Sequence, residues 1–222
     1  MITALDIWKF IHILLFVYWL GADLGVFLLA RAARRSDLTF DQRTLALRMA
    51  LVIDNTPRIA FALMFPAGME LSAEMGAIEP TAVVRALVWL VSAGWVSTVL
   101  GTMRYEGQPL GSSFHRAGVA LKSVLLVTVV GIGLSSVLGH GPFPDGWLGW
   151  KVLLFGCIFA CGIMIDREFQ PIVPAFARLS KEGSRPDIEL AITGAVNGAI
   201  RWVLALYALV LVIAFLGTAR PS

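Results

Sequence analysis

The chain has 222 residues, of which 58% are hydrophobic and 15% charged, and its formal net charge is +3. Soluble domains average roughly 45–50% apolar residues, with glycine counted, and about 25% charged residues. A single soluble core would leave too little polar surface to face water. Low net charge and aromatic residues set in apolar runs exclude a disordered or nucleic-acid-binding chain. The composition therefore predicts a multi-span membrane protein that is surrounded by a lipid bilayer and has no nucleic-acid partner.

Six apolar windows are each long enough to cross a hydrocarbon core of about 30 Å. Helices are expected because lipid cannot satisfy backbone polar groups, and the windows lack the two-residue alternation of barrel strands. The predicted fold class is an all-α integral membrane bundle of about six transmembrane helices, forming a single domain over residues 1–222. The windows span residues 5–30, 48–72, 82–103, 116–138, 147–166 and 190–216.

Charge predicts the orientation of the spans. Basic residues follow the first, third and fifth windows, whereas the other connections carry acidic residues and His140. By the positive-inside rule, the basic connections face the cytoplasm. Both chain ends are then predicted to lie outside, which six spans permit and five or seven would not. The longest inner connection, residues 171–187, is rich in proline and is expected to be a loop.

A stripe of polar residues in the first window is the main functional candidate. Lys9, His12, Trp19 and Asp23 fall within an arc of roughly 80° on a helix and should face the bundle or a wet cavity. His12 is about two turns in from the end, too deep and too short to reach the headgroups. A neutral imidazole is the commonest metal ligand and an axial ligand of haem. The alternative is a structural, hydrogen-bonded histidine.

Other intramembrane charges each have two interpretations. Lys151 follows Trp147 at the start of the fifth window, where it either provides a cation for an anionic group or snorkels beside interfacial tryptophans. Arg58 lies four residues after Asp54, so it either pairs with that carboxylate or donates to an acidic ligand. Glu70, at the predicted outer end of the second window, is expected to be solvated.

The two remaining histidines differ in position. His140 lies in a short outer loop, on the same predicted side as His12, and is either a second axial ligand or a plain loop residue. His115 begins the fourth window on the inner side, far from His12. It is expected to be a solvated residue at a helix end.

Two stripes of small or sulfur-bearing residues recur at about one helical turn. In the fourth window the small residues predict close packing of a neighbouring helix. In the fifth window the sulfur-bearing residues suit Cu(I) or, more simply, packing between helices. The first stripe is Gly131, Ser135 and Gly139, and the second is Cys157, Cys161 and Met164.

Two short motifs resemble those of HemJ-type protoporphyrinogen IX oxidases. One is Lys9-x-x-His12 followed by Trp19, and the other is a Trp-Leu-x-x-Lys run from Trp147 to Lys151. The second window also carries an arginine between prolines, near where that family places a functional arginine. The wider group includes CopD-like copper-resistance membrane proteins.

The resemblance implies a haem b-binding oxidoreductase of the bacterial inner membrane. It implies that His12 is the axial ligand and that Lys151 and Arg58 bind or orient porphyrin. Independently of the family, a macrocycle between helices needs an aromatic wall, which Trp19 and Trp147 can supply. The implied reaction is the six-electron oxidation of protoporphyrinogen IX, with electrons passed towards quinone.

Two alternatives remain open at this point. A CopD-like copper transport protein would use His12, His140, Met69 and Met75, with the sulfur-bearing stripe deeper in the membrane. A non-catalytic membrane subunit would anchor or relay electrons for a larger complex. The expected partners are a porphyrin or quinone, with a second copy of the chain or a membrane-complex subunit left open.

Overall fold

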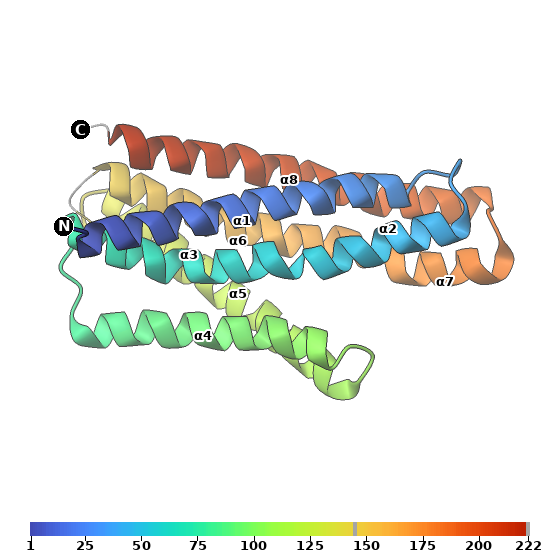
Figure 1. Ribbon diagram of the computed structural model, residues 1–222, viewed down its shortest axis with the longest axis horizontal. Helices are drawn as coiled ribbons and strands as arrows, with labels where there is room; N and C mark the ends of the chain where they lie inside the picture. Colours follow the sequence, from blue (N-terminus) through green and yellow to red (C-terminus); the bar gives the residue numbers. More distant parts are fainter. Residues whose placement is uncertain (144–145, 221–222) are drawn as a thin grey trace. The chain divides into compact units, whose positions relative to one another are not determined.

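The computed structural model describes residues 1–143 and 146–220, and these residues form eight α-helices and no strand (Figure 1). Helices α1, α4, α5 and α8 and the stretch Gly146–Glu182 are long and apolar enough to cross a membrane. The protein is therefore an all-α, multi-pass membrane bundle, as its composition predicts. The helices are α1 Ala4–Ala33, α2 Phe40–Ile53, α3 Asn55–Glu74, α4 Ala82–Arg104, α5 Pro109–Val137, α6 Gly146–Phe169, α7 Ile172–Glu182 and α8 Pro186–Ala219.

The predicted window 48–72 covers parts of two helices, α2 and α3, which meet at Asp54. Pro57 has no backbone N–H, so the carbonyl of Ile53 lacks its usual donor, and α2 ends at that residue. Pro66 lies inside α3 without ending it. The apolar window 48–72 therefore contains the break between α2 and α3.

The predicted loop 171–187 is also different, because it contains the amphipathic helix α7. The prolines that suggested a loop, Pro171 and Pro174, lie at the start of this helix, where a missing N–H costs little. Its buried residues are spaced as on one helical face. They are Ile172, Ala175, Phe176 and Leu179.

The chain divides into two compact units, and each is described by itself. The first unit comprises residues 1–23 and 54–122, which are the first part of α1, all of α3 and α4, and the start of α5. Helix α3 packs against α4, where the Ser92 hydroxyl donates to the Ala62 carbonyl at 2.5 Å. Most residues on the inward side of α3 are buried, so α3 is the core helix of this unit.

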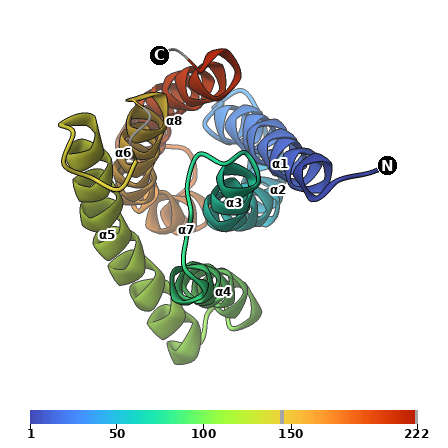
Figure 2. The same cartoon turned by 90° about the vertical axis from the view of Figure 1, so that its left-hand side faces the viewer.

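The second unit comprises residues 24–53 and 123–222. Its helices α6 and α8 lie side by side (Figures 1 and 2). Gly133 of α5 lies directly against the Leu153 backbone of α6, and a Cβ on Gly156 would be 2.7 Å from Val130. A Cβ on Gly131 would meet nothing within 4 Å. The close α5–α6 contact therefore uses Gly133 and Gly156, not the predicted stripe that begins at Gly131.

A small apolar core joins the end of α1, α2, α7 and the start of α8 in this second unit. Beside it, Arg43 is 2% exposed and donates to both carboxylate oxygens of Glu189, at 2.8 and 2.9 Å. Its Nε donates to the Ala33 carbonyl at 2.9 Å, and its guanidinium lies over the Phe176 ring. Because its partners come from α1, α7 and α8, Arg43 of α2 joins these four helices.

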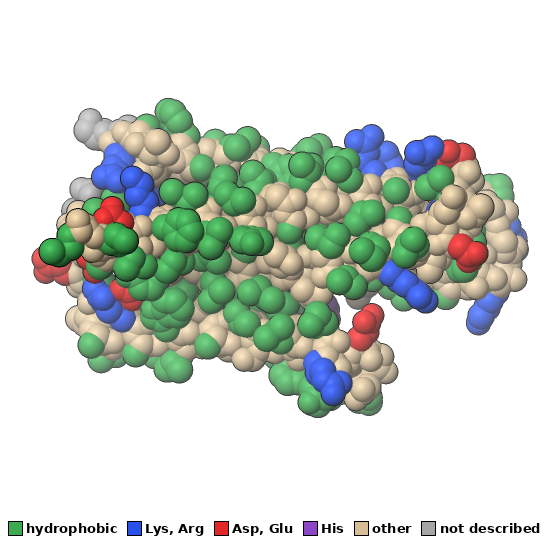
Figure 3. All heavy atoms as spheres, in the orientation of Figure 1, with side chains coloured by type: hydrophobic (Ala, Val, Ile, Leu, Met, Phe, Trp, Pro, Cys, Tyr) green, Lys and Arg blue, Asp and Glu red, His purple; other side chains and the backbone are tan. Residues whose placement is uncertain are grey.

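The surface has the distribution expected of membrane helices. On the face drawn in Figure 3, hydrophobic side chains cover the middle of the long helices, and charged side chains gather near helix ends. Many large apolar residues are exposed, among them Val127 and Phe215. Lipid is the solvent that such a surface suits.

Candidate functional site

The imidazole of His12 lies against the backbone of Gly68 in the first unit. A Cβ on Gly68 would be 3.2 Å from His12 Cε1 and 3.6 Å from Nδ1. The His12 side chain is half-buried, and its Nδ1 atom is shielded from solvent. The Gly68 carbonyl accepts a hydrogen bond from the Ser72 hydroxyl at 2.8 Å. The imidazole is therefore turned towards α3, and the absent side chain at Gly68 gives it room.

Tryptophans flank His12 along the same face of α1. Trp19, seven residues on, is 6% exposed and stacks on Phe61 at a centroid distance of 4.8 Å. Phe61 in turn meets the ring of Trp95 edge-on at 5.0 Å. These rings form an apolar wall across α1, α3 and α4, two turns from His12.

Trp8, one turn before His12, is half-buried and contacts Trp89 at a centroid distance of 6.1 Å. Lys9, by contrast, is exposed, and Asp23 is half-buried. The inward face of α1 is thus centred on Trp8, His12 and Trp19. Lys9 lies at its edge.

Glu70 is buried, whereas a solvated residue was expected. Its carboxylate is 5% exposed and accepts from Arg85 Nη1 at 2.8 Å and from Trp89 Nε1 at 3.2 Å. The donors come from the first two turns of α4, so this cluster joins α3 to α4. The partners lie 15 and 19 residues from Glu70 in sequence, beyond the reach of helical periodicity. The available signal was an arginine in the first turn of the next apolar window.

Arg58 forms the predicted ion pair with Asp54. Its Nε donates to Asp54 Oδ2 at 2.6 Å, one turn away at the start of α3. Both side chains are partly exposed. Much of the charge of Arg58 is therefore balanced by its own neighbour.

The other predicted site residues lie in the second unit. Lys151 is half-buried on α6, and its Nζ lies where a Cβ on Gly217 of α8 would be 2.5 Å away. Trp147, one turn earlier, lies under the guanidinium of Arg220 at 6.0 Å. His140 is exposed in the turn after α5, with its backbone N–H bonded to the Ser135 carbonyl. Thus His12, Trp19 and Arg58 belong to one unit, and Lys151, Trp147 and His140 belong to the other.

Among the described residues, no three or more histidine, cysteine, aspartate or glutamate side chains gather as metal ligands. Cys157 is half-buried and Cys161 buried on α6, and both are free thiols. Axial ligation of haem differs from such a centre because it needs only one or two protein side chains.

Comparison with known proteins gave no match to this chain, whether with family models, with curated proteins or with solved structures. The class of the protein is therefore defined by its own architecture. It is an all-α, multi-pass integral membrane protein with an inward-facing histidine among tryptophans.

Proposed function

We propose that this protein is a haem b-binding membrane oxidoreductase that resembles the HemJ-type protoporphyrinogen IX oxidases and works in the bacterial inner membrane. The observation that carries the proposal is the half-buried His12 imidazole, turned towards Gly68 and flanked by Trp8 and Trp19 on one face of α1. An intramembrane ionisable residue on an inward face is expected to have a function.

The side chains present fit the requirements of the group. A haem between helices needs an axial imidazole, an aromatic wall and cations for its two carboxylates. His12 would be the axial ligand, and the stacked rings of Trp19 and Phe61 would form part of the wall. In the second unit, described by itself, Lys151 would bind or orient a porphyrin beside Trp147. When bound, the haem would supply one-electron transfer.

The protein residues would have binding and orienting roles. His12 would be held in one orientation by the Gly68 backbone, and the aromatic wall would exclude water. Arg58, held by Asp54 through its Nε, would orient a porphyrin carboxylate. The proposed reaction removes six electrons and six protons from protoporphyrinogen IX, which reduces three quinones to quinols.

The test is an absorption spectrum of protein purified in mild detergent from haem-replete cells. The wild type should show a Soret band, with split visible bands on reduction. His12→Ala should abolish or shift these bands, whereas His115→Ala should retain them. His140→Ala, measured in parallel, reports whether a second axial ligand comes from the loop. Colourless wild-type protein would contradict the proposal, and bound copper in its place would favour a CopD-like carrier.

Lys151→Met tests the binding of the porphyrin substrate and not the ligation of the haem iron. It should lower protoporphyrinogen oxidation more than it lowers the thermal stability of the purified protein. Lys181→Met is the matched control, because Lys181 is an exposed lysine on α7 with no role in the proposal. Full activity of Lys151→Met would show that Lys151 only snorkels.

A further inference from the structure

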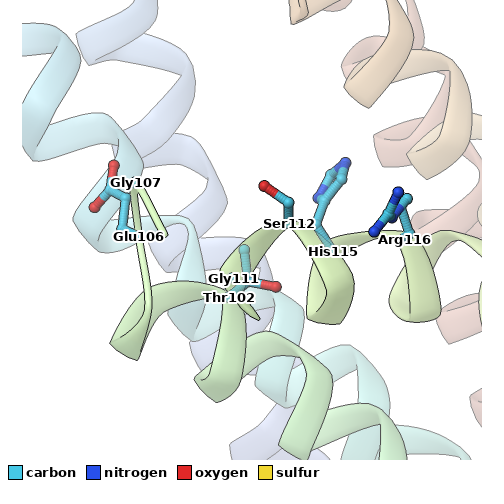
Figure 4. A pocket seen from close by; sticks show the side chains of 7 residues that line it. All are labelled: Thr102, Glu106, Gly107, Gly111, Ser112, His115 and Arg116. Atoms are coloured by element: carbon cyan, nitrogen blue, oxygen red, sulfur yellow. The ribbon is translucent and has the colours of Figure 1, made fainter. Parts of the chain in front are cut away.

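A pocket of about 300 Å³ lies at the turn between α4 and α5 in the first unit (Figure 4). Its side chains come from the last turn of α4, from the connecting turn and from the first turns of α5. Nothing lies within 4 Å of where a Cβ on Gly107 would be, which leaves room for a small guest, whereas Gly111 lets α5 lie against the Tyr105 carbonyl. The polar side chains that line it are Thr102, Glu106, Ser112, His115 and Arg116.

The charges of this pocket are separated. Ser112, His115 and Arg116 are spaced as on one face of α5. Glu106 lies at the opposite side of the pocket from Arg116 (Figure 4). Within the described chain, no ion pair joins Glu106 to Arg116 or to any other side chain, and Arg116 makes only a 3.4 Å contact with the Ser113 hydroxyl. Opposite charges therefore face one pocket without neutralising each other.

The two hydroxyl groups are suited to opposite partners. The Thr102 hydroxyl already donates to the Thr98 carbonyl at 2.7 Å, so towards the pocket it can only accept. The Ser112 hydroxyl makes no hydrogen bond to a described residue, and it is available as a donor. The Thr102 hydroxyl thus adds an acceptor to the acidic side of the pocket, and the Ser112 hydroxyl adds a donor to its basic side.

The pocket lies at a membrane surface. It is formed where one membrane-spanning helix, α4, ends and the next, α5, begins. Met103 and Leu110 on either side of the turn are large, apolar and exposed. Such residues belong in lipid, so the turn between them lies at the depth of the headgroups.

We propose that this pocket binds a phosphoethanolamine group, as carried by phosphatidylethanolamine. Arg116, His115 and the Ser112 hydroxyl bind the phosphate, and Glu106 with the Thr102 hydroxyl binds the primary ammonium. A trimethylammonium headgroup cannot donate hydrogen bonds to Glu106, and a glycerol headgroup has no cation. The site should therefore prefer phosphatidylethanolamine to phosphatidylcholine and phosphatidylglycerol.

The experiment is native mass spectrometry of delipidated full-length protein titrated with each of these three phospholipids. Wild-type protein should bind phosphatidylethanolamine about threefold to fivefold more tightly than the other two, as expected for a partly exposed ion pair. Glu106→Gln should abolish the preference over phosphatidylglycerol. Arg116→Gln should weaken all three lipids.

Two matched variants are the controls. Arg104→Gln removes an exposed arginine of the same helix end that lies over Tyr105 and outside the pocket lining. Glu79→Gln removes an exposed acid between α3 and α4. Both should bind as the wild type does. Equal binding of the three lipids by the wild type, or equal effects of Arg104→Gln and Arg116→Gln, would overturn the proposal.

Titration with soluble glycerophosphoethanolamine shows whether the bound phosphoethanolamine group belongs to a lipid or to a soluble molecule. If it binds as tightly as phosphatidylethanolamine, the ligand is a soluble molecule. If only phosphatidylethanolamine binds, the ligand is a membrane lipid. All substituted residues are exposed, so the variants should keep the wild-type melting temperature. The site is independent of His12, and its failure would leave the haem proposal untouched.

Discussion

At the residue scale, the His12 ring lies against α3 at a position that has no side chain. Gly68 is the position on α3 that the imidazole contacts, with the ring 3.2 Å from where a Cβ would be. That distance is tighter than ordinary packing, so any side chain there would displace the ring by a few tenths of an ångström. The absence of a side chain at Gly68 thus allows the inward orientation of the His12 ring.

Gly68→Ala should therefore cost stability instead of adding it. Overpacking of this kind costs roughly 1 kcal/mol or more. Glycine to alanine in an open helical position gains about 0.5–1 kcal/mol. Gly94→Ala on α4, where nothing lies within 4 Å, is the matched control. Thermal unfolding in detergent measures both, and a rise in melting temperature for Gly68→Ala would show that the ring is free to move aside.

Periodicity predicted the inward direction of His12 and Trp19, because both follow from the 100° step of a helix. It did not predict the pairing of Glu70 with Arg85 and Trp89, because those partners lie on another helix. Burial of the carboxylate depends on that pairing, since an isolated charge would be costly there. Periodicity also predicted an inward direction for Lys9, which is exposed, and it cannot identify partners on another helix.

At the element scale, the prolines mark the starts of helices. Pro57 lies in the first turn of α3, and Pro171 and Pro174 lie at the start of α7, and hydropathy alone shows neither case. In the first turn of a helix the missing N–H has no helical acceptor to lose, whereas the preceding helix cannot continue through the proline. This explains why one predicted span contains a helix break and one predicted loop is a helix.

The α5–α6 contact depends on glycine at defined positions. A side chain on Gly133 would collide with the Leu153 backbone, which cannot move as a flexible side chain can. Gly133→Ala should lower stability by about 2–3 kcal/mol, at the upper end for overpacking. Gly131→Ala, two residues away on the open side of α5, should be neutral or slightly stabilising. Fluorescence-detected size-exclusion chromatography after heating compares them, and equal melting temperatures would contradict the packing.

At the scale of the whole molecule, composition predicted the all-α membrane bundle because a high apolar content suits a lipid solvent. The division into two units was not predicted from the sequence, because two of its boundaries fall inside helices. These lie between Asp23 and Leu24 in α1 and between Lys122 and Ser123 in α5. Helix α3 is the part of the predicted second span that does not meet the apolarity of the other candidates. It has 20 residues, about 30 Å of helix, but carries Arg58 and Glu70 and is not among the apolar candidates in the described chain.

Labelling with a membrane-impermeant maleimide tests whether α3 crosses. In a background with Cys157→Ala and Cys161→Ala, Thr3→Cys and Arg220→Cys should both react in intact cells. Gln108→Cys, in the turn after α4, should react only after permeabilisation, because the positive-inside rule places it in the cytoplasm. If α3 does not cross, Thr3→Cys and Arg220→Cys will react from opposite sides, and five spans will replace six.

Helix α8 has 34 residues, about 51 Å at 1.5 Å per residue, which exceeds a hydrocarbon core of about 30 Å. Its first turns lie with α7 and α2 in a small core tied by Arg43, and ion pairs of Arg178 with Glu182 and Asp187 lie on its surface. This end of the second unit therefore extends beyond the hydrocarbon core into water. In electron cryomicroscopy it would give image alignment a landmark outside the detergent belt, and it offers antibody fragments an ordered epitope.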